Sequence, residues 1–496
     1  MEKLHLLSAM VFLPALGAIW VTFLARGEKG VKFSAAAFTA VTFLLSLSLF
    51  CLFDRSAPGL QFVERAAWIP AINAEYFLGV DGLGLSMVVL TTFLGFLAVL
   101  VSWVEIQERV REYFAWLLLL ETSILGVFCA QDFLLFFLFW EIEIIPMYFL
   151  ISIWGTPPPL GRREYSAIKY VLYTFIGSAL MLAGILLAYF HTGTWSMPEL
   201  MERVPELALG LRTLIFWLIF FCFAVKLPMF PLHTWLPDAH TDAPTAGSVM
   251  LAGALIKMGG YGMIREVGIF PEVAKTYAFM LVLFALVNAL YGAAVTLRQT
   301  DLKRLIAYSS ISHMGYVLLG IFALSRLSLT GAALQMFSHG LITGMLFALV
   351  GLVYHKAHER RIGLLGGLAR QMPLMAVAFS IAGLASLGLP TTSGFAAEFI
   401  TFWGSFTSSV FPAIKICTVV ALTCIVITAG YMLWVIERVF YREPKSEYDG
   451  TPDLSPLELA ISALFIAGIM LIGVYPRVLT DVIMPGIMPM AKVLGL

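Results

Sequence analysis

Six ionisable side chains lie within long apolar runs of this 496-residue chain, and their chemical types suit the movement of protons. They are Glu141, Lys226, Lys257, His313, His339 and Glu398. A charge at the centre of a bilayer costs roughly 2.5–3.5 kcal/mol on insertion scales, so such residues usually pair or line a water-filled path. Acids, bases and histidines in one bundle can pass a proton by successive protonation. We find no nucleophile triad or metal-ligand cluster in the sequence that competes with this interpretation.

Lys226 stands at the start of a proline-rich break, in the stretch "FAVKLPMFPLHTWLPDAHTDAPTAG" at 223–247. Each proline removes a backbone donor and interrupts a helix. Inside a bilayer the freed backbone groups must face protein or water and not lipid. Lys226 either extends to the membrane interface or exchanges protons in a partly dry site beside a carboxylate. We expect the break to let water reach it.

The other candidates also have structural alternatives. Lys257 is too deep in its span to reach the interface easily, and neighbouring glycines would allow close helix approach. Glu398 restarts a helix after a second break at Pro390, where it could simply complement the helix dipole. His313 and His339 lie on neighbouring spans and could form a relay, because histidine titrates near pH 6.5. Each alone could equally be a structural hydrogen-bond donor.

Glu141 and Glu143 compete for one role in "FFLFWEIEIIPMYFL". Two residues apart on a helix, they point about 200° from each other, so both cannot face one seam. The mid-span position favours Glu141, although both could be interfacial carboxylates. We therefore treat Glu143 as a secondary candidate, together with Glu121 and His240. Lys415 is weaker still and is given no central role.

The elements that must position these residues are membrane-spanning helices. The chain is 60% hydrophobic and only 12% charged, against about 25% charged residues in soluble domains. Many apolar runs reach about 20 residues, the length that crosses the hydrocarbon core. We predict an all-α polytopic fold with fourteen spans, centred on 5–25, 33–53, 84–104, 114–130, 133–154, 166–190, 211–229, 246–264, 275–297, 304–323, 329–354, 374–407, 412–436 and 456–475. The N-terminal run is better interpreted as a retained first span than as a cleaved signal peptide.

Basic residues predict the orientation, because Lys and Arg gather in cytoplasmic loops. Arg162, Arg163, Lys303, Arg304 and Arg360 fall on one side, which favours both termini on the outer (periplasmic) side of the inner membrane. The net charge is zero, so nothing indicates nucleic-acid binding. No C-x-x-C pair, Walker A loop or strand–GxGxxG–helix unit occurs. We expect no cofactor or metal on this chain.

Spans seven and twelve are alike, because each breaks at proline beside an ionisable residue. Paired broken helices favour an inverted-repeat transporter. The predicted division is 1–110 for helices 1–3, 111–270 for a first repeat (helices 4–8), 271–440 for a second repeat (helices 9–13) and 441–496 for helix 14.

Several long motifs resemble those of the antiporter-like subunits of respiratory complex I. The segments "KLPMFPLHTWLPDAHTDAPTAGSVMLAGALIKMGGYG" and "DLKRLIAYSSISHMGYVLLG" carry the general resemblance. The segments "YFLGVDGLGLSMVVLTTFL", "LLFFLFWEIEIIPMYFLISIWG" and "LPTTSGFAAEFITFWGSF" look like the M type in particular. The related L and N types carry lysine where this chain has Glu398. The resemblance covers nearly the whole chain.

The resemblance implies two inverted five-helix repeats with discontinuous helices seven and twelve, and proton pumping driven by quinone reduction elsewhere. It assigns Glu141 as the helix-five carboxylate that pairs with Lys226, Lys257 as the central lysine, and Glu398 as the group on the exit side. His313 and His339 match the linking path. Glu143 departs from the family pattern, which has an apolar residue there.

The partners implied are the other membrane-arm subunits, L-type and N-type chains among them. NADH, FMN, iron–sulfur clusters and quinone are expected in partner subunits. Three rival interpretations remain open from the sequence. The first is a subunit of a multi-component cation/proton antiporter, and the second is a membrane arm that serves a hydrogenase or a ferredoxin-driven quinone reductase. The third is a structural scaffold with buried polar contacts.

Overall fold

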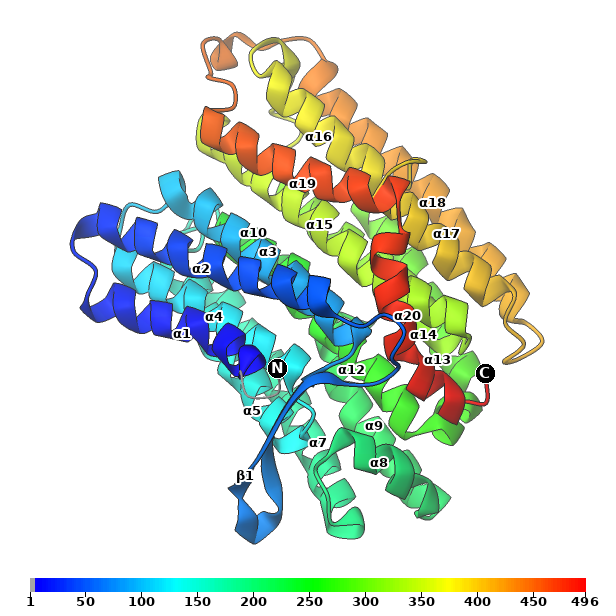
Figure 1. Cartoon of the computed structure of the whole chain (residues 1–496). Coiled ribbons are helices and arrows are strands. Elements are labelled where there is room, and N and C mark those ends of the chain that lie inside the picture. The colour runs from blue at the N-terminus through cyan, green and yellow to red at the C-terminus, as the bar shows by residue number, and fades with distance from the viewer. Residues whose placement is uncertain (1–4) are drawn as a thin grey trace.

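The computed structural model describes residues 5–496 as a bundle of long helices (Figure 1). The elements are α1 (Leu6–Phe23), α2 (Gly27–Leu52), β1 (Gln61–Ile69), β2 (Ala74–Val80), α3 (Gly82–Glu105), α4 (Val110–Cys129), α5 (Phe133–Ile142), α6 (Ile144–Trp154), α7 (Arg163–Thr192), α8 (Met197–Arg203), α9 (Leu209–Lys226), α10 (Trp235–Asp242), α11 (Thr245–Met250), α12 (Ile256–Ile269), α13 (Pro271–Thr296), α14 (Leu302–Phe322), α15 (Arg326–Ala357), α16 (Pro373–Ser386), α17 (Ser393–Phe406), α18 (Ile414–Ile436), α19 (Pro456–Val474) and α20 (Arg477–Val493).

The predicted polytopic helical fold is confirmed. Within residues 5–496, 13 helices are long and apolar enough to cross a membrane. The remaining predicted span is the broken one, which consists of α16 and α17 separated by residues 387–392. Breaks occur at both predicted places, since α9 ends at Lys226 and α10 begins only at Trp235. The assignment of these helices to two inverted repeats stays a prediction.

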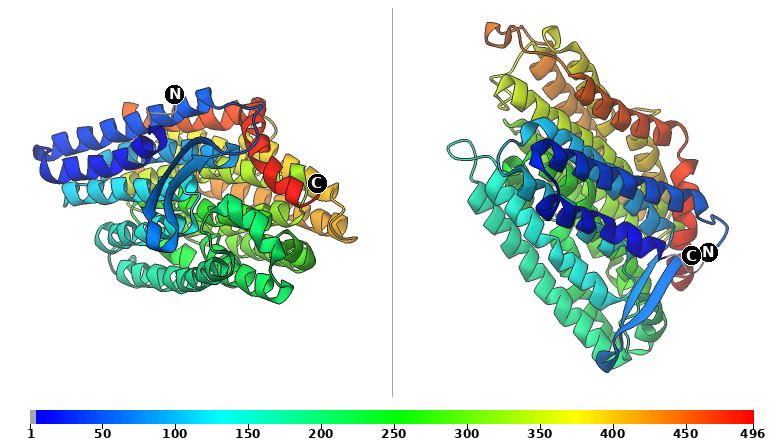
Figure 2. Two further views of the ribbon diagram at one scale, coloured as in Figure 1. Left: turned by 60° about the horizontal axis from the view of Figure 1, so that its bottom comes forward. Right: turned by 60° about the vertical axis from the view of Figure 1, so that its left-hand side comes forward.

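Two elements were not predicted. Residues 61–80 form an antiparallel hairpin of β1 and β2, and α20 follows the last span. The hairpin, the start of α1 and the end of α20 lie toward the same end of the bundle, which we call the hairpin end (Figure 2). α20 packs against α3 so closely that a Cβ on Gly486 would lie 2.7 Å from the backbone nitrogen of Leu83. Only glycine fits there.

The helices that carry the candidate residues occupy the middle of the bundle. The segment Thr245–Ile269, α14 and α15 are almost wholly buried, whereas α1, α2, α7 and α19 keep wide exposed apolar faces. Figure 1 shows α1 and α2 (blue) on one flank and α16 to α19 (yellow to orange) on another. Lys257, His313 and His339 are therefore enclosed by protein and not by lipid.

Protein side chains satisfy the backbone groups that the first break sets free. The indole of Trp235 donates to the carbonyl of Val225 at 3.0 Å, and the backbone N–H of Phe230 donates to the Asn288 side chain at 2.8 Å. Pro228 and Pro231 have no N–H to satisfy. This agrees with the rule that irregular backbone at membrane depth is tolerated only where protein or water covers it.

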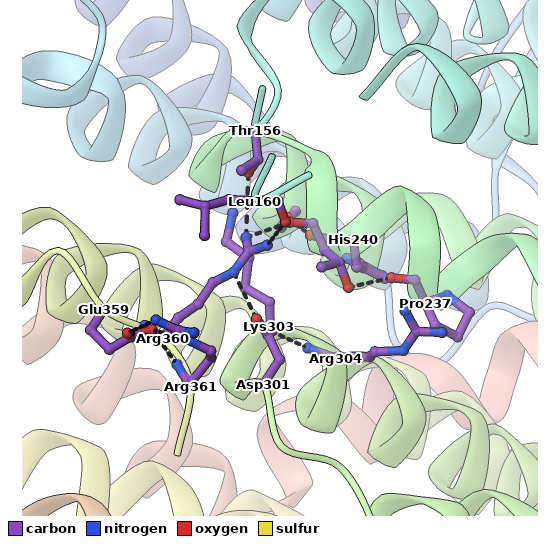
Figure 3. A network of polar contacts seen from close by, with 12 residues as sticks. Thr156, Leu160, Pro237, His240, Asp301, Lys303, Arg304, Glu359, Arg360 and Arg361 are labelled. Atoms are coloured by element: carbon purple, nitrogen blue, oxygen red, sulfur yellow. Dashed lines mark hydrogen bonds and ion pairs between the residues drawn. The ribbon is translucent and has the colours of Figure 1, made fainter. Parts of the chain in front are cut away.

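Arg360 joins the two halves of the chain at the end opposite the hairpin (Figure 3). Its guanidinium pairs with Asp301 at 2.7 Å and donates to the carbonyls of Thr241 at 2.8 Å and Leu160 at 3.2 Å. Arg360 is 5% exposed. The next residue differs, because Arg361 is largely exposed and binds only its neighbour Glu359 in this network, holding the pKa of that carboxyl down at about 2.

The two adjacent arginines make a matched test of what holds the halves together. Arg360→Ala leaves Asp301 and two carbonyls without their buried partner, which should cost about 3 kcal/mol or more. Arg361→Ala removes an exposed pair worth about 0–1 kcal/mol. We expect Arg360→Ala alone to lower the thermal midpoint of the detergent-solubilised protein by several degrees. Equal midpoints for the two variants would contradict this role for Arg360.

Candidate functional site

A buried ion pair joins α9 to the junction between α5 and α6. The Nζ of Lys226, at the end of α9, binds Oε1 of Glu143. Tyr170 of α7 donates to the other Glu143 oxygen at 2.6 Å and accepts from Lys226 at 3.3 Å. The side chains of Lys226 and Glu143 are 1% and 0% exposed. A buried pair is stable only when its remaining lone pairs are also satisfied, and Tyr170 supplies that contact.

The expected pairing of Glu141 with Lys226 is wrong in this structure, because Glu143 takes that place. The cause lies in helix geometry. Pro146 cannot donate to the carbonyl of Ile142, so the helix is interrupted at Glu143 between α5 and α6. Glu143 faces α9, and Glu141, about 200° away, is only partly buried beside Ser178 of α7. Glu141 still lies within electrostatic range of Lys226.

The expectation that the break brings water to Lys226 is also not met. The side chain of Lys226 is enclosed by Glu143, Tyr170 and Trp140, whose ring centroid lies 5.7 Å from Nζ. The proline break therefore positions the lysine for an ion pair and does not open it to solvent.

Lys257 begins the central group. It is fully buried in the first turn of α12, and its Nζ donates to the carbonyl of Ala252. That carbonyl belongs to a π-helical turn, Leu251–Leu255, which interrupts the helix between α11 and α12. Such turns are frequent at functional sites. The sequence carries no clear signature for it.

His339 and His313 extend the group from Lys257 into the second half of the chain. Lys257 Nζ lies 2.7 Å from Nδ1 of His339 on α15. The rings of His339 and His313 are 5.5 Å apart between centroids. His313, on α14, has the carbonyls of Ser309 and Ser386 at 2.8 and 3.0 Å from its two nitrogens. Only the doubly protonated imidazolium can donate to both acceptors.

Glu398 closes the group on α17, between two cavities. Its carboxylate is 3.8 Å from Nε2 of His313. One cavity of about 10 Å³, lined by His313, His339 and Glu398 among others, is near the minimum size for a single water. The other, of about 480 Å³, is lined mainly by aromatic rings of α17 and also touches Glu398. The carboxylate thus stands between the polar interior and a wide apolar side pocket.

Glu121 and Lys415 stand apart from this line. Glu121 is buried in α4 against Gly95 of α3, and its Oε1 has no hydrogen-bond partner within the described chain. Lys415 is exposed. No group of three or more His, Cys, Asp or Glu in residues 5–496 is placed to hold a metal ion.

His240 of α10 lies closer to the central lysine than Glu121 does to any of these groups, because the charge of Lys257 acts on it. Its ring is buried and stacks on Phe347, with centroids 4.5 Å apart, and neither ring nitrogen has a partner among residues 5–496. The charges of Lys303 and Lys257 both act on it. Figure 3 shows His240 beside the network that contains Lys303 and Arg360. It lies between the end opposite the hairpin and the central lysine.

The sequence did not predict the role of Tyr170 in the buried ion pair, nor the ion pair between Asp81 and Arg265. Tyrosine is common in apolar helices, so Tyr170 gave no signal. Asp81 and Arg265 pair at 2.5 Å near the hairpin end. The sequence feature that could have predicted this pair is the position of the two charges. Asp81 precedes the predicted span 84–104 and Arg265 follows the span 246–264, so both fall on the same side of the membrane.

The chain is similar to known membrane proteins over most of its length. The family described as "NADH:quinone oxidoreductase/Mrp antiporter, TM" matches residues 130–425. The chain is 42% identical to NADH-quinone oxidoreductase subunit M of Rhodobacter capsulatus, over 97% of this chain and 96% of the relative. It is 42% identical to NAD(P)H-quinone oxidoreductase chain 4 1 of a Synechococcus species, over 96% and 90%.

Solved structures agree with these sequence relatives. A chain of respiratory complex I from Thermus thermophilus with bound NADH superposes with a TM-score of 0.88 at 29% identity, covering 99% of this chain and all of that one. A chain of the Mrp complex from a Dietzia species gives 0.84 at 22% identity, covering 97% of this chain but 52% of that one, and shows the shared fold alone. The chain therefore belongs to the NADH:quinone oxidoreductase/Mrp antiporter family of membrane proteins.

Proposed function

We propose that this chain is an M-type, proton-translocating membrane subunit of an NADH-quinone oxidoreductase. The observation that carries the proposal is the line of buried ionisable groups from Lys257 through His339 and His313 to Glu398. Lys257 Nζ is 2.7 Å from His339 Nδ1, the two histidine rings are 5.5 Å apart between centroids, and His313 Nε2 is 3.8 Å from the Glu398 carboxylate. All four side chains are buried in protein. Such groups are rare in membrane spans unless charge moves through them.

In this proposal, opening and closing of the Glu143–Lys226 ion pair controls when a proton enters the line of groups that begins at Lys257. While the pair is closed, Lys226 is held away from the centre. When it opens, Lys226 can pass its proton toward Lys257, because α12 packs directly on the break. A Cβ on Gly259 would lie 2.7 Å from the backbone nitrogen of Leu227. The charge then moves through the histidines to Glu398, which we propose as the group on the exit side.

The proposal extends to the assembly. The chain sits among other membrane-arm subunits, for which we propose L-type and N-type antiporter-like chains. NADH, FMN, iron–sulfur clusters and quinone belong to partner subunits, and this chain adds no redox centre of its own. We propose the inner membrane as its location, with both termini on the outer side. His240 would then admit protons from the side of Lys303 and Arg360.

A cation/proton antiporter subunit is the second candidate, since the family includes Mrp chains. Subunit M of Rhodobacter capsulatus favours the oxidoreductase, because it matches this chain at 42% identity over nearly the full length of both proteins. By contrast, this chain covers only 52% of the length of the Mrp chain. Affinity purification of the tagged chain from native membranes separates the two. Co-purifying NADH-oxidising and iron–sulfur subunits would support the oxidoreductase, and cation-antiporter subunits alone would contradict it.

The two glutamates of the α5–α6 junction offer a paired test. Glu143→Gln leaves Lys226 buried without its anion, whereas Glu141→Gln removes a half-buried neighbour. We expect Glu143→Gln to reduce NADH-driven proton uptake by inverted membrane vesicles about tenfold or more, in line with the loss of a buried partner. Glu141→Gln should reduce it less. The reverse order would show that Glu141 is the working partner of Lys226.

Replacing Lys257 distinguishes a role in proton transport from a purely structural role of the buried charges. Lys257→Ala removes the central proton carrier and should abolish NADH-driven proton uptake in assembled complex. Lys415→Ala, at an exposed lysine on α18, is the matched control and should leave uptake unchanged. If Lys257→Ala assembled fully and pumped at the normal rate, the buried charges would be scaffold contacts and the proposal would fail.

A further inference from the structure

Two polar residues of α12, Tyr261 and Arg265, take no part in the proposed path. They follow Lys257 at intervals of four residues, so all three lie along one face of the helix. Arg265 is about 12 Å from Lys257 along the axis, at 1.5 Å per residue. The stripe leads from the central lysine toward the hairpin end. The adjacent Glu266 lies on another face, against Phe220 of α9.

Arg265 is fixed by contacts on both sides. It donates to the two oxygens of Asp81 at 2.5 and 2.8 Å and to the hydroxyl of Tyr261 at 3.0 Å. Asp81 also accepts from the backbone N–H of Gly84 at 2.9 Å, where it caps α3. Tyr261 is fully buried and donates in turn to the carbonyl of Phe128 at 3.2 Å.

A cavity lies directly outside this cluster. It has a volume of about 270 Å³ and is lined by Asp81, Arg265 and Gln131, together with residues of α8, α20 and the segment before β1. A water occupies about 30 Å³ of the liquid, so several waters fit, and polar atoms are present to bind them. This water would stand two helical turns from Lys257, with only Arg265 and Tyr261 on the face between them.

The direction of the hydrogen bonds prevents proton relay through the cluster. An arginine keeps its proton at all physiological pH values, so it can neither accept one from the cavity nor pass one on. Tyr261 receives a hydrogen bond from Arg265 and directs its own proton at a backbone carbonyl. Both Asp81 oxygens are already occupied. A fixed guanidinium also repels protons and other cations, as arginines do in water-selective pores.

We propose that Arg265, anchored by Asp81, is a seal that stops protons in the hairpin-end cavity from leaking back to Lys257. The inference rests on the proposed function, since a seal matters only where Lys257 carries protons. It assigns the Asp81–Arg265 pair a barrier role in addition to its capping and clamping of α3 against α12.

The test measures passive leak, with no electron donor present. Asp81→Asn/Arg265→Gln removes both charges together, so neither is left buried alone. The assembled complex is reconstituted into vesicles, a pH gradient is imposed, and its decay is followed with an internal pH dye. We expect the decay rate attributable to the protein to rise about tenfold. Arg212→Gln, which breaks an Arg–Glu pair of 2.9 Å outside the cavity lining, should leave it unchanged.

Further variants separate the outcomes. Arg265→Lys serves if the double variant does not assemble, because it keeps a cation beside Asp81 and so preserves the contact between α3 and α12. A lysine can release its proton, so we still expect the proton leak to rise severalfold. Adding Lys257→Ala to the double variant should stop the leak. A leak that survives without Lys257 would overturn the seal but not the proposed function. Gradient decay at the wild-type rate in both assembled Arg265 variants would overturn the seal outright.

Discussion

The structure depends on keeping charge away from hydrocarbon while leaving some of that charge able to move. Lys226 and Glu143 show the first requirement, because each neutralises the other's field and Tyr170 completes the hydrogen bonding. Removing any one of the three would leave a buried group without compensation. The remaining helices are arranged around this requirement. The segments that carry Lys257, His313 and His339 are the most deeply buried, and α1, α2, α7 and α19 keep exposed apolar faces.

Interruptions of the helices supply the polar contacts that these charges need. The carbonyl of Ala252, within a π-helical turn, accepts from Lys257, and the carbonyl of Ser386, at the end of α16, lies against His313. Ser386 ends its helix at the second break, so its carbonyl is one of the terminal acceptors that no following turn uses. The first contact therefore forms within one helical segment, and the second joins α16 to α14.

Much of this could be predicted from the sequence, because the signals are local. Apolar run length located the spans, and prolines located both breaks. Depth within a run selected Lys257. The choice of Glu143 over Glu141 could not be predicted, since it depends on how the α5–α6 junction turns toward α9. The π-helical turn beside Lys257 was missed for a similar reason, as its residues fit an ordinary helix equally well. The hairpin of residues 61–80 could not be predicted from apolar run length, because its strands are short and mix charged with apolar residues.

The π-helical turn has a mechanical consequence. The acceptor for Lys257 is a main-chain oxygen, so no change of side chain at Ala252 can take it away. Its position is set by the winding of one turn between α11 and α12. Rewinding that turn to an ordinary α-helix would rotate Ala252 relative to Lys257 and so change the position of this oxygen relative to Nζ. Torsion applied anywhere along this buried segment would therefore reach Lys257 as a change in its hydrogen bonding, without any neighbouring side chain having to move first.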